Sequence, residues 1–129
     1  MRCQDIPPRV FLDSSMTRPA ERNAMSEKTP EISLEDYATE RETGVTIDVR
    51  EQAEYAQAHV PGAILMPMAQ LGSRLGEIDG SARVHVICAS GNRSKAMTDL
   101  LVAAGFDAAS VAGGTSGWIE SGRAVGVGL

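Results

Sequence analysis

Short apolar runs alternate with stretches of helical spacing along the chain from Ile32 onward. The runs 45–49, 84–87 and 108–111 consist mostly of valine, isoleucine and alanine, which predicts three buried strands. Helices are predicted from the N-cap residue Ser33 to Gly44, and over 51–58, 68–75, 94–104 and 115–121. Parallel strands need crossover connections, and helices in those connections cover the sheet. The pattern therefore predicts an α/β fold with an open, mainly parallel sheet and helices on both faces.

The predicted helix 94–104 has a single apolar face. That face carries Ala96, Met97, Leu100, Leu101 and Ala104, and Gly105 stands where a C-terminal cap belongs. Trp118, in the last predicted helix, is expected in the core rather than in a substrate site.

The first 30 residues differ in composition from the rest. They hold four of the six prolines and show no sustained period, so residues 1–30 are predicted to be a flexible N-terminal extension. Docking of the apolar cluster Val10–Leu12 on the domain is the alternative. A chain of 129 residues has room for one ordinary domain, which is predicted over 31–129.

Net charge and cysteine content limit the classes of partner and the cellular compartment that fit this chain. A net charge of −5 disfavours nucleic acid and anionic membranes as main partners. No window approaches the roughly 18 apolar residues of a membrane span, and the first twenty residues lack the apolar stretch of a secretory signal. Cys3 and Cys88 do not form a disulfide framework. We therefore expect a cytoplasmic protein whose thiols are reduced.

Candidate chemistry gathers in the loop that follows the run 84–87. Cys88 stands at the predicted strand end, and the small residues Ala89, Ser90 and Gly91 lead into a helix expected to start at about Ser94. Such a loop lets successive backbone N–H groups point at one spot, where the helix N-terminus adds partial positive charge. This environment stabilises a thiolate, so Cys88 is the predicted nucleophile. Arg93 is predicted to be a cation that binds an oxyanion.

Five ordered segments carry a resemblance to a known family, the single-domain rhodaneses, which are thiosulfate sulfurtransferases and related persulfide carriers. These segments are Ile47–Arg50, Glu54–Tyr55, His59–Ala63, Cys88–Ser94 and Gly113–Trp118. The resemblance runs from about Ile32 to the C-terminus, with Ala58 standing where the family usually has glycine.

The resemblance implies a rhodanese-like fold and a two-step sulfur transfer. Cys88 would attack the outer sulfur of thiosulfate, release sulfite and hold a persulfide among the amides of residues 89–93. Cyanide or a thiol would then accept the sulfur, and a sulfur-relay protein is a possible partner. Arg93 would act with Cys88 in catalysis. The substrate-binding residues are expected to be Ala89, Ser90, Gly91, Asn92 and Ser94.

Two other functions remain open on the sequence. One is a cysteine phosphatase or arsenate reductase on the related fold, but four residues separate Cys88 from Arg93, whereas the phosphatase pattern has five. The other is a non-catalytic protein-binding module, which has no physical need for a caged thiolate.

Polar residues outside the loop receive structural interpretations. Arg50 and Glu54 are four residues apart and are predicted to form an ion pair or cap. His59, before Pro61, is predicted to be a hydrogen-bonded structural residue, and His85 to be packed or half exposed. Neither histidine has a second ligand at metal spacing, so no zinc site is predicted. The sulfur transfer that the resemblance implies needs no metal and no organic cofactor.

Overall fold

A five-stranded parallel sheet forms the centre of the computed structural model, which describes residues 29–129. The strands are β1 (Glu31–Ile32), β2 (Val45–Asp48), β3 (Ile64–Leu65), β4 (Val84–Ile87) and β5 (Ala108–Val111). Their order is β1-β5-β4-β2-β3, and every pairing between these strands is parallel. The predicted α/β fold with a parallel sheet is confirmed. Residues 1–28 of the predicted extension lie outside the described residues.

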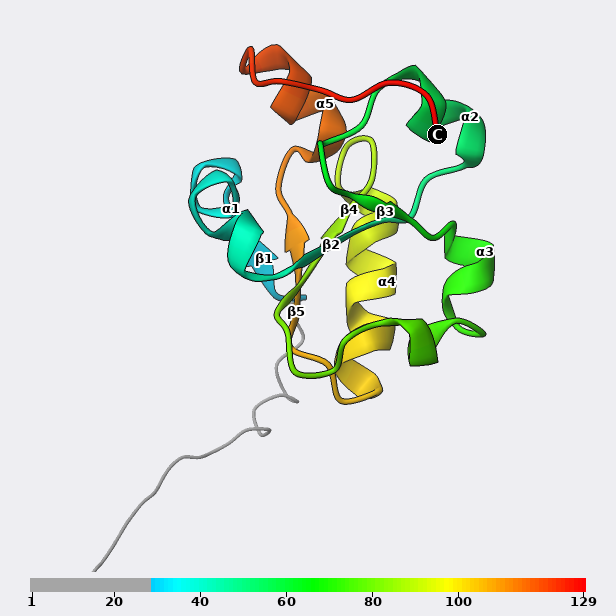
Figure 1. Cartoon of the computed structure of the whole chain (residues 1–129). Coiled ribbons are helices and arrows are strands. Elements are labelled where there is room, and N and C mark those ends of the chain that lie inside the picture. The colour runs from blue at the N-terminus through cyan, green and yellow to red at the C-terminus, as the bar shows by residue number, and fades with distance from the viewer. Residues whose placement is uncertain (1–28) are drawn as a thin grey trace, which may run out of the picture.

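Helices cover the two faces of this sheet (Figure 1). They are α1 (Leu34–Glu40), α2 (Gln52–Gln57), α3 (Met68–Leu71), α4 (Asn92–Ala103) and α5 (Gly114–Glu120), with short 3₁₀ turns at Arg41–Thr43 and Leu75–Glu77. One apolar cluster packs the sheet against α3 and α4 and includes Ile47, Val86 and Leu101. A second packs the opposite face against α1 and α5 and includes Tyr37 and Trp118. Successive residues of a strand point to opposite faces, which explains this division of the core.

The local sequence explains where the helices begin. Ser33 caps α1 by accepting a hydrogen bond from the Asp36 backbone N–H at 3.1 Å, as predicted. Glu51 and Glu54 form a capping box that starts α2. Gly91 precedes α4 with φ at +114°, a conformation that glycine adopts without strain.

Two helix predictions need correction. The predicted helix 68–75 is broken into α3, which ends at Leu71, and a separate 3₁₀ turn. Helix α4 begins at Asn92 instead of Ser94, because the left-handed Gly91 ends the loop earlier. The buried face of α4 also includes Ser94 and Thr98, whereas Ala96 and Ala104 are exposed. Ser94 on that face contacts a polar position of the sheet, because its Oγ lies 2.7 Å from the Ser110 Oγ on β5.

The sheet topology places several loops at one edge. The chain runs outward from β2 to β3 on one side and from β4 to β5 on the other, so its direction reverses between β2 and β4. In open parallel sheets, such a reversal leaves a crevice at the carboxyl ends of the strands. Cys88 directly follows β4 at this edge. The end of β2 lies beside it, since the Val49 backbone N–H donates to the Ile87 carbonyl at 3.0 Å.

Candidate active site

Cys88 lies at the centre of a small polar site. It is a free cysteine and only 1% exposed. The Gly91 backbone N–H donates to its Sγ at 3.0 Å, and the Ser94 Oγ lies 3.5 Å from the same atom. The loop thus closes over the sulfur after three residues and joins it to the first turn of α4.

These contacts determine how readily the thiol ionises. Burial opposes ionisation, but hydrogen bonds from the Ser94 hydroxyl and from the backbone N–H groups of Ser94, Gly91 and Ser90 outweigh it. The pKa of the Cys88 thiol therefore lies below its ordinary value of 9.0. A thiolate is the nucleophilic form of cysteine, so this environment favours the reactive state.

The Ser94 hydroxyl is held by partners of its own. Its Oγ donates to the Gly91 carbonyl at 3.1 Å and shares a 2.7 Å hydrogen bond with the Ser110 Oγ on β5. Ser94 and Ser110 are fully buried. Ser110 was not among the predicted site residues, although a lone hydroxyl within the apolar run 108–111 could have pointed to it.

Backbone hydrogen bonds join the start of α5 to the loop that contains Cys88. The Thr115 backbone N–H donates to the Cys88 carbonyl at 2.8 Å, and the Ser116 N–H donates to the Ala89 carbonyl at 3.0 Å. A Cβ atom at Gly114 would lie 2.4 Å from the Cys88 carbonyl oxygen. Glycine at this position therefore permits the close approach of the two segments.

The remaining predicted loop residues lie at the solvent-facing rim of the site, around the buried Cys88. Ser90 and Asn92 are exposed, Ala89 is half-buried, and Asn92 and Arg93 belong to the first turn of α4. The structure brings Gly91 and Ser94 to the sulfur by direct hydrogen bonds, whereas the Ser90 and Asn92 side chains face solvent.

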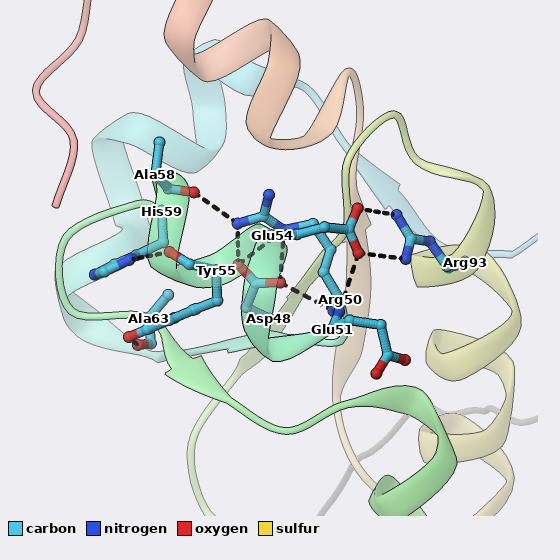
Figure 2. Close-up of polar contacts among 9 residues, drawn as sticks. All are labelled: Asp48, Arg50, Glu51, Glu54, Tyr55, Ala58, His59, Ala63 and Arg93. Atoms are coloured by element: carbon cyan, nitrogen blue, oxygen red, sulfur yellow. Dashed lines mark hydrogen bonds and ion pairs between the residues drawn. The ribbon is translucent and has the colours of Figure 1, made fainter. Parts of the chain in front are cut away.

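Arg93 is engaged by a carboxylate from another element (Figure 2). Its two terminal nitrogens each donate to one Glu54 oxygen at 2.9 Å, forming a bidentate ion pair between α4 and α2. The Arg93 guanidinium is the main cause that brings the pKa of Glu54 down to about 2. Glu54 in turn raises the pKa of Arg93, and the charge of Cys88 adds to that effect.

The predicted pairing of Arg50 with Glu54 is wrong. Arg50 forms a buried ion pair with Asp48 at 2.9 Å and donates to the Ala58 carbonyl at 2.8 Å. Asp48 is a partner two residues away in the same strand-end turn, and it also accepts from the Arg50 backbone N–H at 3.0 Å. Glu54 is therefore left to pair with Arg93.

Both histidines have structural partners. The His59 ring stacks on Tyr55 at a centroid distance of 3.8 Å, and its Nδ1 lies 2.8 Å from the Tyr55 carbonyl. His85 is fully buried and lies 2.7 Å from a Glu40 oxygen. Among residues 29–129, no group of three or more histidine, cysteine or acidic side chains is placed to hold a metal ion. Trp118 is 4% exposed and packs in the core, as predicted.

Comparison with known proteins decides the family. A model of the rhodanese-like domain matches residues 33–121, which is more than half of the chain. The chain belongs to the rhodanese-like family. It contains no helix over residues 29–129 that is long and apolar enough to cross a membrane.

Individual relatives agree with this assignment. A rhodanese-related protein from Thermoplasma volcanium superposes with a TM-score of 0.73 at 30% identity, covering 76% of this chain and 98% of that one. A thiosulfate sulfurtransferase from Pseudomonas aeruginosa gives a TM-score of 0.71 at 32% identity, covering 78% of this chain and 21% of that one.

A relative from Bacillus subtilis is described as a candidate sulfur carrier protein, YrkF. It is 34% identical over 80 residues, which covers 60% of this chain and 43% of the relative. The rhodanese-like chain thus spans less than half the length of that protein.

Proposed function

We propose that this rhodanese-like protein is a sulfurtransferase that moves a sulfane sulfur from thiosulfate or a persulfide donor to a thiophilic acceptor through a Cys88 persulfide. The observation that carries the proposal is the buried Cys88 sulfur, which accepts the Gly91 backbone N–H at 3.0 Å and contacts the Ser94 hydroxyl at 3.5 Å. Membership in a sulfurtransferase family supports it. The names of the Pseudomonas aeruginosa and Bacillus subtilis relatives point the same way.

The first step would use the chemistry of a thiolate. Cys88 attacks the outer sulfur of thiosulfate, an S–S bond forms on Cys88, and the donor's S–S bond breaks with its electron pair leaving on sulfite. The product is a Cys88 persulfide, whose terminal sulfur is again an anion. The amides of the loop and the N-terminus of α4 stabilise that charge.

The second step would return the enzyme to its starting state. A cyanide ion or a thiolate attacks the terminal sulfur, and Cys88 leaves as a thiolate. A leaving group of low pKa departs readily, so the same contacts that stabilise the thiolate assist this step. No general base is needed, because the nucleophile is already ionised.

The geometry favours sulfur over phosphate or arsenate chemistry. Cys88 is 1% exposed beneath a loop whose fourth residue already begins α4. A sulfane sulfur is a terminal atom and reaches a recessed nucleophile end-on, whereas a tetrahedral phosphoryl group needs a wider loop. A cytoplasmic location, where a free thiol stays reduced, fits this chemistry and stays a prediction.

Transfer of sulfur to cyanide tests the proposed function. The protein with thiosulfate and cyanide should form thiocyanate, and Cys88→Ser should abolish this activity. Cys3→Ser is the matched control and should turn over at the wild-type rate, because the reaction is assigned to Cys88 alone. Full activity in Cys88→Ser, or the absence of thiocyanate with thiosulfate and with a polysulfide donor, would contradict the proposal. Hydrolysis of p-nitrophenyl phosphate at a comparable rate would favour the phosphatase alternative instead.

A further inference from the structure

The Arg93 side chain does not present an uncompensated charge to a substrate. Two of its N–H groups are used by the Glu54 carboxylate, each at 2.9 Å, and the two side chains are about equally exposed at 35% and 36%. Glu54 also accepts the Glu51 backbone N–H at 3.0 Å, so its carboxylate is fixed from both α2 and α4. The pair is thus a defined part of the rim and not a loose surface contact.

A second ion pair lies beside the first, on the side of Glu54 away from Arg93 (Figure 2). Asp48 and Arg50 neutralise each other within the buried turn after β2. With Cys88 as a thiolate, three negative groups (Asp48, Glu54 and Cys88) face two positive ones (Arg50 and Arg93). These five groups together therefore carry an excess of one negative charge before any substrate arrives.

This charge balance discriminates between sulfur donors. Thiosulfate brings two negative charges toward the site, whereas an alkyl persulfide anion or a thiosulfonate brings one. Repulsion by the uncompensated negative charge grows with the charge of the incoming donor. Hydrogen bonds from the loop amides favour any anion at the sulfur, but they do not change with the charge at the donor's far end.

We infer that Glu54 is a specificity-determining residue that offsets Arg93 and directs Cys88 toward sulfane-sulfur donors bearing a single negative charge in preference to dianionic thiosulfate. This inference rests on the proposed sulfurtransferase function. The favoured class includes small alkyl persulfides, RSS⁻. With such a donor, the Cys88 thiolate bonds to the terminal sulfur and the donor's S–S bond breaks, releasing the thiolate RS⁻ and leaving the Cys88 persulfide.

Two probes separate donor charge from other donor properties. Thiosulfate and methanethiosulfonate both present a sulfane sulfur on an oxidised sulfur, but they carry two charges and one charge, respectively. The second probe releases methanesulfinate as thiosulfate releases sulfite. The ratio of their kcat/KM values, measured with cyanide as acceptor, reports how strongly the site selects on donor charge.

Two variants test the role of Glu54. Glu54→Gln removes the charge and keeps a residue that supports the capping box of α2. It should raise the thiosulfate-to-methanethiosulfonate ratio by about three- to tenfold, the size of one partly screened charge interaction. Glu54→Asp keeps the charge and should leave the ratio near that of the wild type.

The matched control is Glu77→Gln. Glu77 ends the 3₁₀ turn 75–77 and forms an ion pair with Arg74 at 2.9 Å, which this substitution breaks. It should leave the ratio unchanged. Added salt should shrink the difference between Glu54→Gln and the wild type.

The outcomes distinguish this inference from the proposed function. If the wild type forms thiocyanate from neither probe, the sulfurtransferase assignment fails. If both probes react but Glu54→Gln leaves the ratio unchanged, only the role of Glu54 fails. An equal shift in Glu54→Asp would attribute the effect to side-chain position instead of charge, and would also overturn the inference.

Discussion

Replacing Ser94 by alanine removes one hydroxyl from the contacts that surround the Cys88 sulfur. That hydroxyl lies 3.5 Å from the sulfur, 3.1 Å from the Gly91 carbonyl and 2.7 Å from the Ser110 Oγ. When Cys88 is a thiolate, the hydroxyl can turn its proton toward the sulfur, and Ser110 can donate to the Ser94 oxygen in its place. Ser94→Ala should therefore raise the pKa of the Cys88 thiol.

The size of the effect follows from the contacts that remain. A hydrogen bond to a charged group contributes about 1.5–3 kcal/mol, and the 3.5 Å contact belongs at the low end of this range. The backbone amides of Ser90, Gly91 and Ser94 still favour the thiolate in the variant. One pKa unit corresponds to about 1.4 kcal/mol, so a rise of about one unit is expected. At a pH below both pKa values, the reactive fraction would fall about tenfold.

Alkylation by iodoacetamide as a function of pH measures this pKa. The experiment uses a Cys3→Ser background, in which Cys88 is the thiol that reacts. Thr98→Val is the matched control, because Thr98 lies on the same buried face of α4 and its hydroxyl has no hydrogen-bond partner among the described residues. Its thiol pKa should equal that of the parent protein.

Two results would refute this reasoning. One is an unchanged pKa in Ser94→Ala, and the other is an equal shift in Thr98→Val, which would attribute the effect to packing. Ser110→Ala provides an independent check, since it removes only the partner of the Ser94 hydroxyl. It should raise the thiol pKa by less than Ser94→Ala does.

Further predictions concern the loop, its rim and the N-terminal segment. Gly91→Ala, at φ +114°, should cost about 1–3 kcal/mol in the free energy of unfolding and slow persulfide formation; a variant as stable and active as the wild type would show that the loop tolerates a side chain there. Arg93→Ala should lower kcat/KM for thiosulfate by roughly ten- to hundredfold, because it removes a cation and leaves Glu54 uncompensated, and adding Glu54→Gln should restore much of the loss; equal kinetics in all three proteins would assign Arg93 a purely structural role. A chain beginning at Met25 should melt within a few degrees of the full chain and show comparable activity, whereas a fall of about ten degrees, on the order of 1–2 kcal/mol, would show that the preceding residues pack on the domain.

The strands that the sequence predicts correctly are the long apolar ones. β4 and β5 have the bounds expected from the runs 84–87 and 108–111, because a parallel strand buried on both faces is apolar at most of its positions. One polar residue interrupts each run, His85 in β4 and Ser110 in β5. The sequence pattern does not predict β1 and β3 as strands. Each is two residues long, and such a segment is too short to show a period. Their pairing with β5 and β2 is a property of the assembled sheet.

The sequence likewise predicts the local features of the candidate site and misses those that join distant segments. A cysteine at a strand end followed by a small-residue loop and a helix is visible in consecutive residues, and the structure places Gly91 and Ser94 against the sulfur. The pairing of Glu54 with Arg93 joins residues 39 positions apart, so helical spacing could not reveal it. That same spacing rule led to the wrong pairing of Glu54 with Arg50.

The mass of the intact protein tests the persulfide on Cys88 most directly. After treatment with thiosulfate or polysulfide and removal of the reagent, the folded protein should gain the mass of one sulfur atom, located on the peptide that contains Cys88. Cyanide or dithiothreitol should remove that mass, and Cys88→Ser should never acquire it. An unchanged mass after both sulfur donors, or the same gain in Cys88→Ser, would contradict the assignment of Cys88 as the sulfur carrier.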